Sequence, residues 1–196
     1  GVYNEVKIYK SKKDVEPMCV VTDDQQAFDI VDNYNLGDQE VTAARSFHIM
    51  SIDSAGNNVR MFVSDALDIT NDSVWHPKNL FKEVVDNVGY PPAFNSACGK
   101  HPLILEKAMF PAWRHVGEWQ AKAILYLAKE KGYQAVFSHF HNLDAFGHTF
   151  FTWAKQRERF DGDEKYYQGL IEQAYIDTDD YIGHYMPLLN EGWTLF

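Results

Sequence analysis

The sequence has little cysteine, little positive charge and no long apolar run. Its two cysteines, Cys19 and Cys98, have no CxxC spacing, which argues against a disulfide framework and against a thiolate zinc site. The 18 Lys and Arg against 28 Asp and Glu give a formal net charge of −10, so nucleic-acid binding through phosphate contacts is disfavoured. Since no stretch of about 18 apolar residues occurs, no membrane span is predicted.

No targeting segment is visible at the N-terminus either. A signal peptide would show a basic region followed by an apolar stretch, and the first residues show neither. The chain starts at Gly1 rather than Met, so this absence says little. The compartment stays open, with a lean towards a soluble, cytoplasmic protein. Apolar residues make up 45% of the chain and aromatic residues 15%, which is typical of a folded protein.

The first third of the chain alternates in the manner of β-strands. Residues 2–9 and 18–22 predict two strands, and a helix is expected over residues 24–33. Residues 45–53 and 59–64 flank a turn rich in Gly and Asn, where β-branched and aromatic residues alternate on both sides. That pattern predicts a β-hairpin.

The pattern becomes helical after about residue 78. Helices are predicted over residues 79–88, 111–130 and 164–189, each from an apolar stripe at helical spacing. The apolar residues 133–137 predict a strand buried on both faces, and residues 193–196 predict the start of another.

Helix, buried strand, loop, helix and strand in this order indicate a parallel sheet with right-handed crossovers. The predicted fold class is therefore α/β. We divide the chain into an α+β cap-like insertion over residues 1–75 and an α/β core segment over residues 76–196. In parallel sheets the chemistry gathers at the carboxyl ends of strands, so the loop after residue 137 is the expected site.

That loop holds a cluster of potential metal ligands. Asp144 and His148 are four residues apart and share a face if the segment makes a helical turn. A carboxylate and an imidazole suit zinc, manganese or iron. His141, His139 and Asn142 are candidates to orient these ligands, with Asn142 able to hydrogen-bond the Asp144 carboxylate. The alternative is a set of polar loop residues satisfied by backbone carbonyls.

The residues of this loop also resemble a known family. Residues 141–148 (HNLDAFGH) resemble the D-x-x-G-H metal motif of the type I phosphodiesterase/nucleotide pyrophosphatase family, within the alkaline phosphatase superfamily. Residues 179–183 (DDYIG) match the D-x-x-I-G helix that follows the motif in that family. The resemblance implies an alkaline-phosphatase-like parallel-sheet core and a hydrolase with two divalent metal ions. Asp144 and His148 would ligate one of them.

The resemblance further implies a small phosphorylated substrate, with zinc as the expected metal and manganese as the alternative. No residue matches the Thr or Ser nucleophile of the family or its remaining ligands. We therefore expect a segment of a larger enzyme that is inactive by itself, with no catalytic residue identified in it. Another superfamily branch, such as a sulfatase or phosphomutase, stays open. A further alternative is that the chain is a non-catalytic cap or oligomerisation module, in which case it could form a homo-oligomer.

An acidic cluster on the last predicted helix is a weaker candidate. Asp177, Asp179 and Asp180 offer hard oxygen ligands, but on a helix with Tyr175 and Tyr181 among them they are better explained as a solvated face with one buried Asp.

Overall fold

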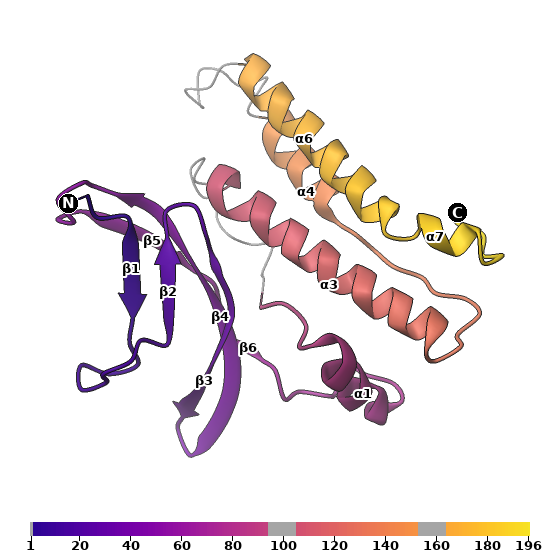
Figure 1. Cartoon of the computed structure of the whole chain (residues 1–196), viewed down its shortest axis with the longest axis horizontal. Coiled ribbons are helices and arrows are strands. Elements are labelled where there is room, and N and C mark those ends of the chain that lie inside the picture. Colours follow the sequence, from indigo (N-terminus) through magenta and orange to yellow (C-terminus); the bar gives the residue numbers. More distant parts are fainter. Residues whose placement is uncertain (1, 94–104, 153–163) are drawn as a thin grey trace. The chain divides into compact units, whose positions relative to one another are not determined.

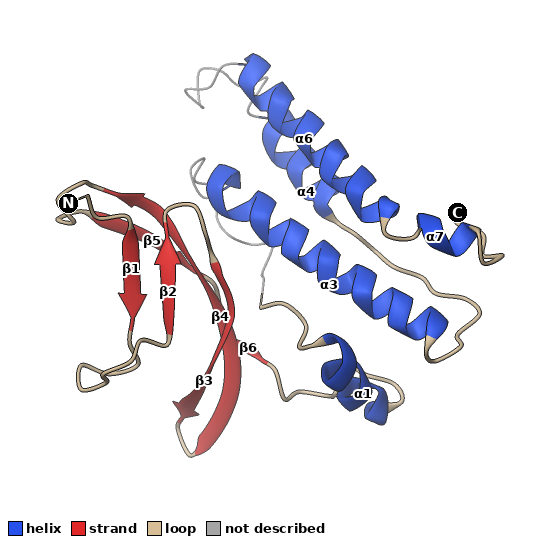
Figure 2. Cartoon of the chain, in the orientation of Figure 1, coloured by secondary structure: helices blue, strands red, loops and turns tan. Residues whose placement is uncertain are grey.

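Strands come first along the chain and helices follow (Figures 1 and 2). The computed structural model describes residues 2–93, 105–152 and 164–196. The chain divides into two compact units, Gly1–Ala112 and Trp113–Phe196. Every strand among the described residues belongs to the first unit. The predicted domain boundary near residue 75 stays a prediction.

A small antiparallel sheet near the N-terminus confirms two of the predicted strands. In it β1 (Glu5–Ile8) pairs with β2 (Cys19–Thr22). Val21 of β2 packs in one apolar cluster with Ala27 and Ile49, which lie on strands of the second sheet. The two sheets of this unit therefore share a core.

The second sheet is built around β4 (Gln39–Ile52), which forms the predicted hairpin with β5 (Val59–Val63). In the turn, the Asp53 carboxylate accepts hydrogen bonds from the Asn58 side chain and from three backbone N–H groups. The Asn58 side chain and these N–H groups stabilise the ionised carboxylate and lower its pKa. Gly56, with φ of 71°, supplies the positive φ that the turn needs. The Asp53 carboxylate thus accepts hydrogen bonds from backbone N–H groups of the turn.

The helix predicted over residues 24–33 is wrong. These residues lie mostly in β3 (Ala27–Leu36), which pairs antiparallel with β4 from Ala27 onwards. The register shifts between Ala27 and Ile30, where Asp29 takes a φ of 53°. This bulge interrupts the period-two alternation at the start of the strand, and pairing with β4 outweighs the weak helical spacing. A short β6 (Leu67–Asp68) also pairs with β4.

Two predicted helices are confirmed. The first is α1 (Lys78–Val88), which ends at Gly89 with a φ of 108°. The second is α3 (Phe110–Lys129), which follows a π-helical turn, η1 (Leu105–Met109). Beyond α3 the chain reverses at Gly132, whose φ is 67°. Glycine at such a position ends a helix without the steric cost that a Cβ would bring.

The predicted strands over residues 133–137 and 193–196 are wrong, because neither segment is a strand in the structure. Residues 133–137 are largely exposed rather than buried on both faces, and Phe137 is 97% exposed. All strand pairs among the described residues are antiparallel. Helices and sheets therefore coexist as expected, but the described residues contain no parallel sheet.

The helix predicted over residues 164–189 is two helices, α6 (Glu164–Gly183) and α7 (Met186–Leu189). Pro187 lies in the first turn of α7. Proline has no backbone N–H to donate to the residue four positions earlier, which here is Gly183, so the helix stops there and restarts. The apolar stripe continues across this break, since Tyr181, Tyr185 and Leu188 are buried in one cluster with Ala121 of α3.

His48 is a buried ionisable residue of the first unit. The side chain lies on β4, the residue is 7% exposed, and neither ring nitrogen has a hydrogen-bond partner among the described residues. Burial lowers the pKa of His48, the positive charge of Lys107 lowers it further, and Asp23 opposes both. The neutral imidazole is therefore the form that this core accommodates.

We expect His48 to make the first unit less stable in mild acid. Its folded pKa lies below the unfolded value of about 6.5, so its neutral form contributes fully above that pH and the contribution is lost as the pH falls towards the folded pKa. His48→Leu removes this loss. The melting temperature of His48→Leu minus that of the wild type should rise progressively as the pH is lowered from about 8 to about 5.5. The exposed His184→Leu is the control, and a His48→Leu difference that is constant with pH would contradict the assignment.

Among the described residues, no helix is both long and apolar enough to cross a membrane.

Candidate metal site

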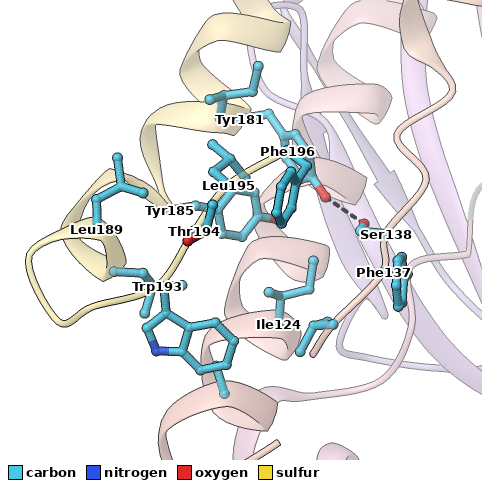
Figure 3. A pocket seen from close by; sticks show the side chains of 14 residues that line it. Ile124, Phe137, Ser138, Tyr181, Tyr185, Leu189, Trp193, Thr194, Leu195 and Phe196 are labelled. Carbon is cyan, nitrogen blue, oxygen red and sulfur yellow. Dashed lines mark hydrogen bonds between the residues drawn. The ribbon is translucent and has the colours of Figure 1, made fainter. Parts of the chain in front are cut away.

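The segment that carries the predicted site is held on the helices of the second unit by aromatic packing. Phe140 stacks on Tyr181 of α6, with ring centroids 4.2 Å apart, and meets Trp113 of α3 edge-on at 5.7 Å. The Ser138 hydroxyl lies 2.8 Å from the Tyr181 hydroxyl (Figure 3). A Cβ at Gly117 would lie 3.2 Å from the Phe140 ring, so the glycine allows this close approach. Residues 138–140 are therefore fixed before the site begins.

The site itself lies on two short consecutive helices. First comes α4 (Asn142–Phe146), and the π-helical η2 (Gly147–Phe151) follows directly. Phe146 and Phe150 are fully buried and stack with centroids 5.5 Å apart, and Phe150 continues onto Tyr167 of α6 at 6.1 Å. These rings hold the inner face of both helices, which leaves the outer face to the polar residues.

Asn142 ties the start of α4 to α6. It is completely buried, and its Nδ2 donates to the Thr178 hydroxyl at 2.8 Å and to the Ala174 carbonyl at 3.3 Å. The sequence predicts that Asn142 can hydrogen-bond the Asp144 carboxylate. Its amide instead bonds to α6, so Asn142 acts on the site by fixing the helix that carries it.

The four remaining candidates come together on the outer face. His148 Nε2 lies 3.3 Å from Oδ1 of Asp144, and His141 Nε2 lies 2.9 Å from Oδ2 of the same carboxylate. His139 Nε2 is 3.1 Å from His141 Nδ1. The side chains of Asp144 and His148 are 52% and 81% exposed, so the pair is open to solvent and to a ligand. Asp144 and His148 therefore lie close together, as their spacing in the sequence predicts.

The spacing of this pair fits one metal ion. Zinc binds carboxylate oxygen and imidazole nitrogen at about 2.0–2.2 Å, and tetrahedral angles then place two such ligands about 3.3 Å apart. The separation of 3.3 Å between Asp144 Oδ1 and His148 Nε2 matches this value. Two ligands do not complete a site. Within the described part of the chain, no group of three or more His, Cys, Asp or Glu residues is arranged to hold a metal ion.

One interaction beside the site was not predicted. Arg114 of α3 forms a two-pronged pair with Asp177 of α6, with Nη2 2.9 Å from Oδ1 and Nε donating to Oδ2 at 3.0 Å. Gln173 also donates to Asp177 Oδ1, at 2.9 Å. The Asp177 side chain is 2% exposed, so of the acidic cluster it is the buried member. A pair that spans 63 residues leaves no local sequence pattern.

An apolar groove also lies on the second unit (Figure 3). Its cavity measures about 330 Å³ and is lined by α3, α6, α7 and the two segments wrongly predicted as strands. Ile124, Tyr185 and Leu189 line one part, and Phe137 and Phe196 lie beside it. Phe196 is fully exposed. The lining of the groove is mainly apolar, and its polar side chains include Ser138, Tyr181 and Thr194.

Comparison of the chain with protein-family models, curated proteins and solved structures finds no match. The assignment of a function therefore depends on the geometry of the second unit and on the residues that carry the resemblance.

Proposed function

We propose that Asp144 and His148 are two ligands of a catalytic divalent metal ion in a phosphate-ester hydrolase similar to type I phosphodiesterases and nucleotide pyrophosphatases. The observation that carries the proposal is the 3.3 Å separation of Asp144 Oδ1 and His148 Nε2 on an exposed face. Zinc suits the mixed oxygen and nitrogen donors, and manganese is the alternative. A small phosphorylated substrate is the proposed partner, because the net charge of −10 opposes nucleic acid.

The number of ligands bears on what the chain does alone. A catalytic zinc takes three protein ligands, and a second metal needs its own. Because Asp144 and His148 supply two, we propose that the other ligands and the nucleophile come from residues outside the described part. When bound, the metal ions would activate the nucleophile and stabilise the leaving oxygen. Asp144 and His148 would hold one ion, and α4 and η2 would keep them at a fixed separation.

The apolar groove supports an alkaline-phosphatase-like core around the site. In α/β proteins, helices bury their apolar stripes against a sheet. Here Phe137, Leu195 and Phe196 are exposed beside the stripe formed by α3, α6 and α7. We propose that a parallel sheet from outside the described residues covers this face.

A cobalt titration tests the metal proposal directly. Cobalt(II) replaces zinc in sites of this chemistry and is paramagnetic, so its binding shifts the NMR signals of ligating histidines. We expect the His148 ring signals to shift first in the wild-type chain and not in Asp144→Asn. Asp179→Asn removes the same charge from an exposed position on α6 and should bind cobalt as the wild type does. Equal binding by the two variants would contradict the proposal.

Hydrolysis distinguishes the proposed chemistry from its alternatives. In the enzyme that carries this segment, Asp144→Ala should abolish hydrolysis of a chromogenic phosphodiester. A sulfate ester hydrolysed in its place would indicate the sulfatase branch. An oligomer that Asp144→Ala breaks, with hydrolysis retained, would indicate a cap or oligomerisation module.

A further inference from the structure

The π-helical turn η1 is held against the second sheet by two hydrogen bonds of Lys107. The Lys107 ammonium donates to the Met50 carbonyl of β4 at 3.1 Å, and the Lys107 carbonyl accepts from the side-chain amide of Gln26 at 3.1 Å. Ala108 and Met109, the next two residues of η1, are 3% and 2% exposed. Lys107 therefore fastens a buried segment to the sheet through its side chain and through its backbone.

The carbonyl that Lys107 binds lies at an irregularity of β4. The register with β5 shifts between Ile49 and Ser51, so Met50 has no residue opposite it in that strand. The extra residue of a β-bulge is left out of the ladder, and its backbone groups need other partners. The Lys107 ammonium supplies one for the Met50 carbonyl. The bulge therefore provides the point at which η1 attaches to β4.

His48 lies two residues before this attachment point, and nothing described would compensate a charge on its ring. The residue is 7% exposed, and neither ring nitrogen has a hydrogen-bond partner among the described residues. The described charges that act on it are those of Lys107 on η1 and Asp23 just after β2. Burial lowers the pKa of His48, Lys107 lowers it further, and Asp23 opposes both. A proton on His48 would therefore place a buried cation near the ammonium that holds η1.

We propose that η1 is a pH-dependent latch on β4, which is closed while His48 is neutral and opens when His48 takes up a proton. A charged imidazole without a hydrogen-bond acceptor is strongly disfavoured in an apolar surrounding. Opening of η1 lets water reach the ring and moves the Lys107 ammonium away, so it relieves both costs. The latch lies in the first unit and does not depend on the proposed metal site. Because α3 follows η1 directly, the latch also determines whether the start of that helix is tied to the sheet.

The pH range of the latch follows from the protonation of its two forms. With η1 open, His48 is solvated and titrates near its ordinary pKa of about 6.5, whereas with η1 closed its pKa is lower. The closed form is therefore fully favoured above that pH and loses its advantage as the pH falls. At about pH 5.5, protonation of the open form should raise its population several-fold, and by at most about 10-fold, over that at about pH 8.

Oxidation of Met109 by hydrogen peroxide measures the open form in the whole chain. A thioether has no proton to lose in this pH range, so its oxidation reports exposure, and peptide mass spectrometry gives the rate for each methionine. Relative to Met186, which is 49% exposed, Met109 should be oxidised several-fold faster at about pH 5.5 than at about pH 8. In His48→Leu this ratio should change by less than about 2-fold. A wild-type ratio that does not rise, or an equal rise in His48→Leu, would overturn the proposal.

A second pair of variants tests the attachment itself. Lys107→Leu removes the donor to the Met50 carbonyl, and we expect Met109 to be oxidised about 3- to 10-fold faster than in the wild type already at about pH 8. Lys122→Leu removes the same charge from an exposed position on α3 and should leave the rate unchanged. If Met109 is oxidised as slowly in Lys107→Leu as in Lys122→Leu, Lys107 does not hold η1 and the latch is wrong.

Urea distinguishes local opening of η1 from unfolding of the whole unit. Local opening exposes little surface, so the wild-type oxidation rate of Met109 at about pH 5.5 should change by less than about 2-fold on addition of about 1 M urea. Unfolding of the whole unit would raise this rate by about 5-fold or more. That result would assign the effect of pH to global stability and overturn the latch.

Discussion

Arg114→Met should lower the free energy of unfolding by about 1–3 kcal/mol, because the Arg114 side chain is itself 48% exposed and the pair is only partly shielded from solvent. The loss itself comes from the burial of its partner. The Asp177 side chain is 2% exposed, and without Arg114 its charge keeps only the hydrogen bond from Gln173 among its described contacts. Removing Arg114 leaves the buried Asp177 carboxylate without its charged partner, which costs more than the loss of an ion pair between two exposed side chains.

Urea unfolding followed by circular dichroism measures this loss, and two further variants control it. Lys122→Met removes the same charge from an exposed position on α3 and should change stability by less than about 0.5 kcal/mol. Arg114→Met combined with Asp177→Leu removes both charges and should recover most of the loss, because two apolar side chains can replace a buried pair. An Arg114→Met protein as stable as Lys122→Met would show that the pair contributes little.

Phe146→Ala should destabilise the second unit by about 3–5 kcal/mol and weaken the proposed metal site as well. The ring is fully buried and stacks on Phe150, which continues to Tyr167 of α6. Phe146 lies between the two proposed ligands in sequence, on the buried face of the same short helices. We expect the spacing of Asp144 and His148 to loosen, although no ligand is altered.

Two measurements separate the effects of Phe146→Ala. Thermal unfolding reports the stability loss, and the cobalt titration at a temperature where the variant is folded reports the site. Phe146→Leu fills most of the volume and should lose about 1 kcal/mol with cobalt affinity nearly unchanged. If Phe146→Ala binds cobalt as the wild type does, the packing beneath α4 and η2 does not set the geometry of the pair.

Local patterns in the sequence predicted the local elements well. The hairpin of β4 and β5 follows from alternation around a Gly- and Asn-rich turn, and α3 follows from an apolar stripe that ends at Gly132. Both signals lie within the element that they specify. The convergence of Asp144 and His148 was predictable for the same reason, because two residues four positions apart lie on the same face of a helix.

Elements that depend on distant partners were not predictable in this way. A bulge at Asp29 concealed the alternation of β3, whose strand character comes from its pairing with β4. The apolar residues 133–137 predicted a buried strand, yet no strand lies beside them among the described residues. The bonds from Asn142 to α6 and from Arg114 to Asp177 cross more than 30 residues. No spacing within one helix indicates such pairs.

The order of pairing around β4 has a consequence for how the protein folds. Its neighbours β3 and β5 are also its neighbours in sequence, and the turn between β3 and β4 has two residues, Gly37 and Asp38. Closing such short loops costs little chain entropy, so this sheet forms early. The candidate site depends instead on α6 returning to α4 from more than 20 residues away. We therefore expect the segment with the proposed metal ligands to assemble after the β3–β4–β5 sheet and to open before it on heating.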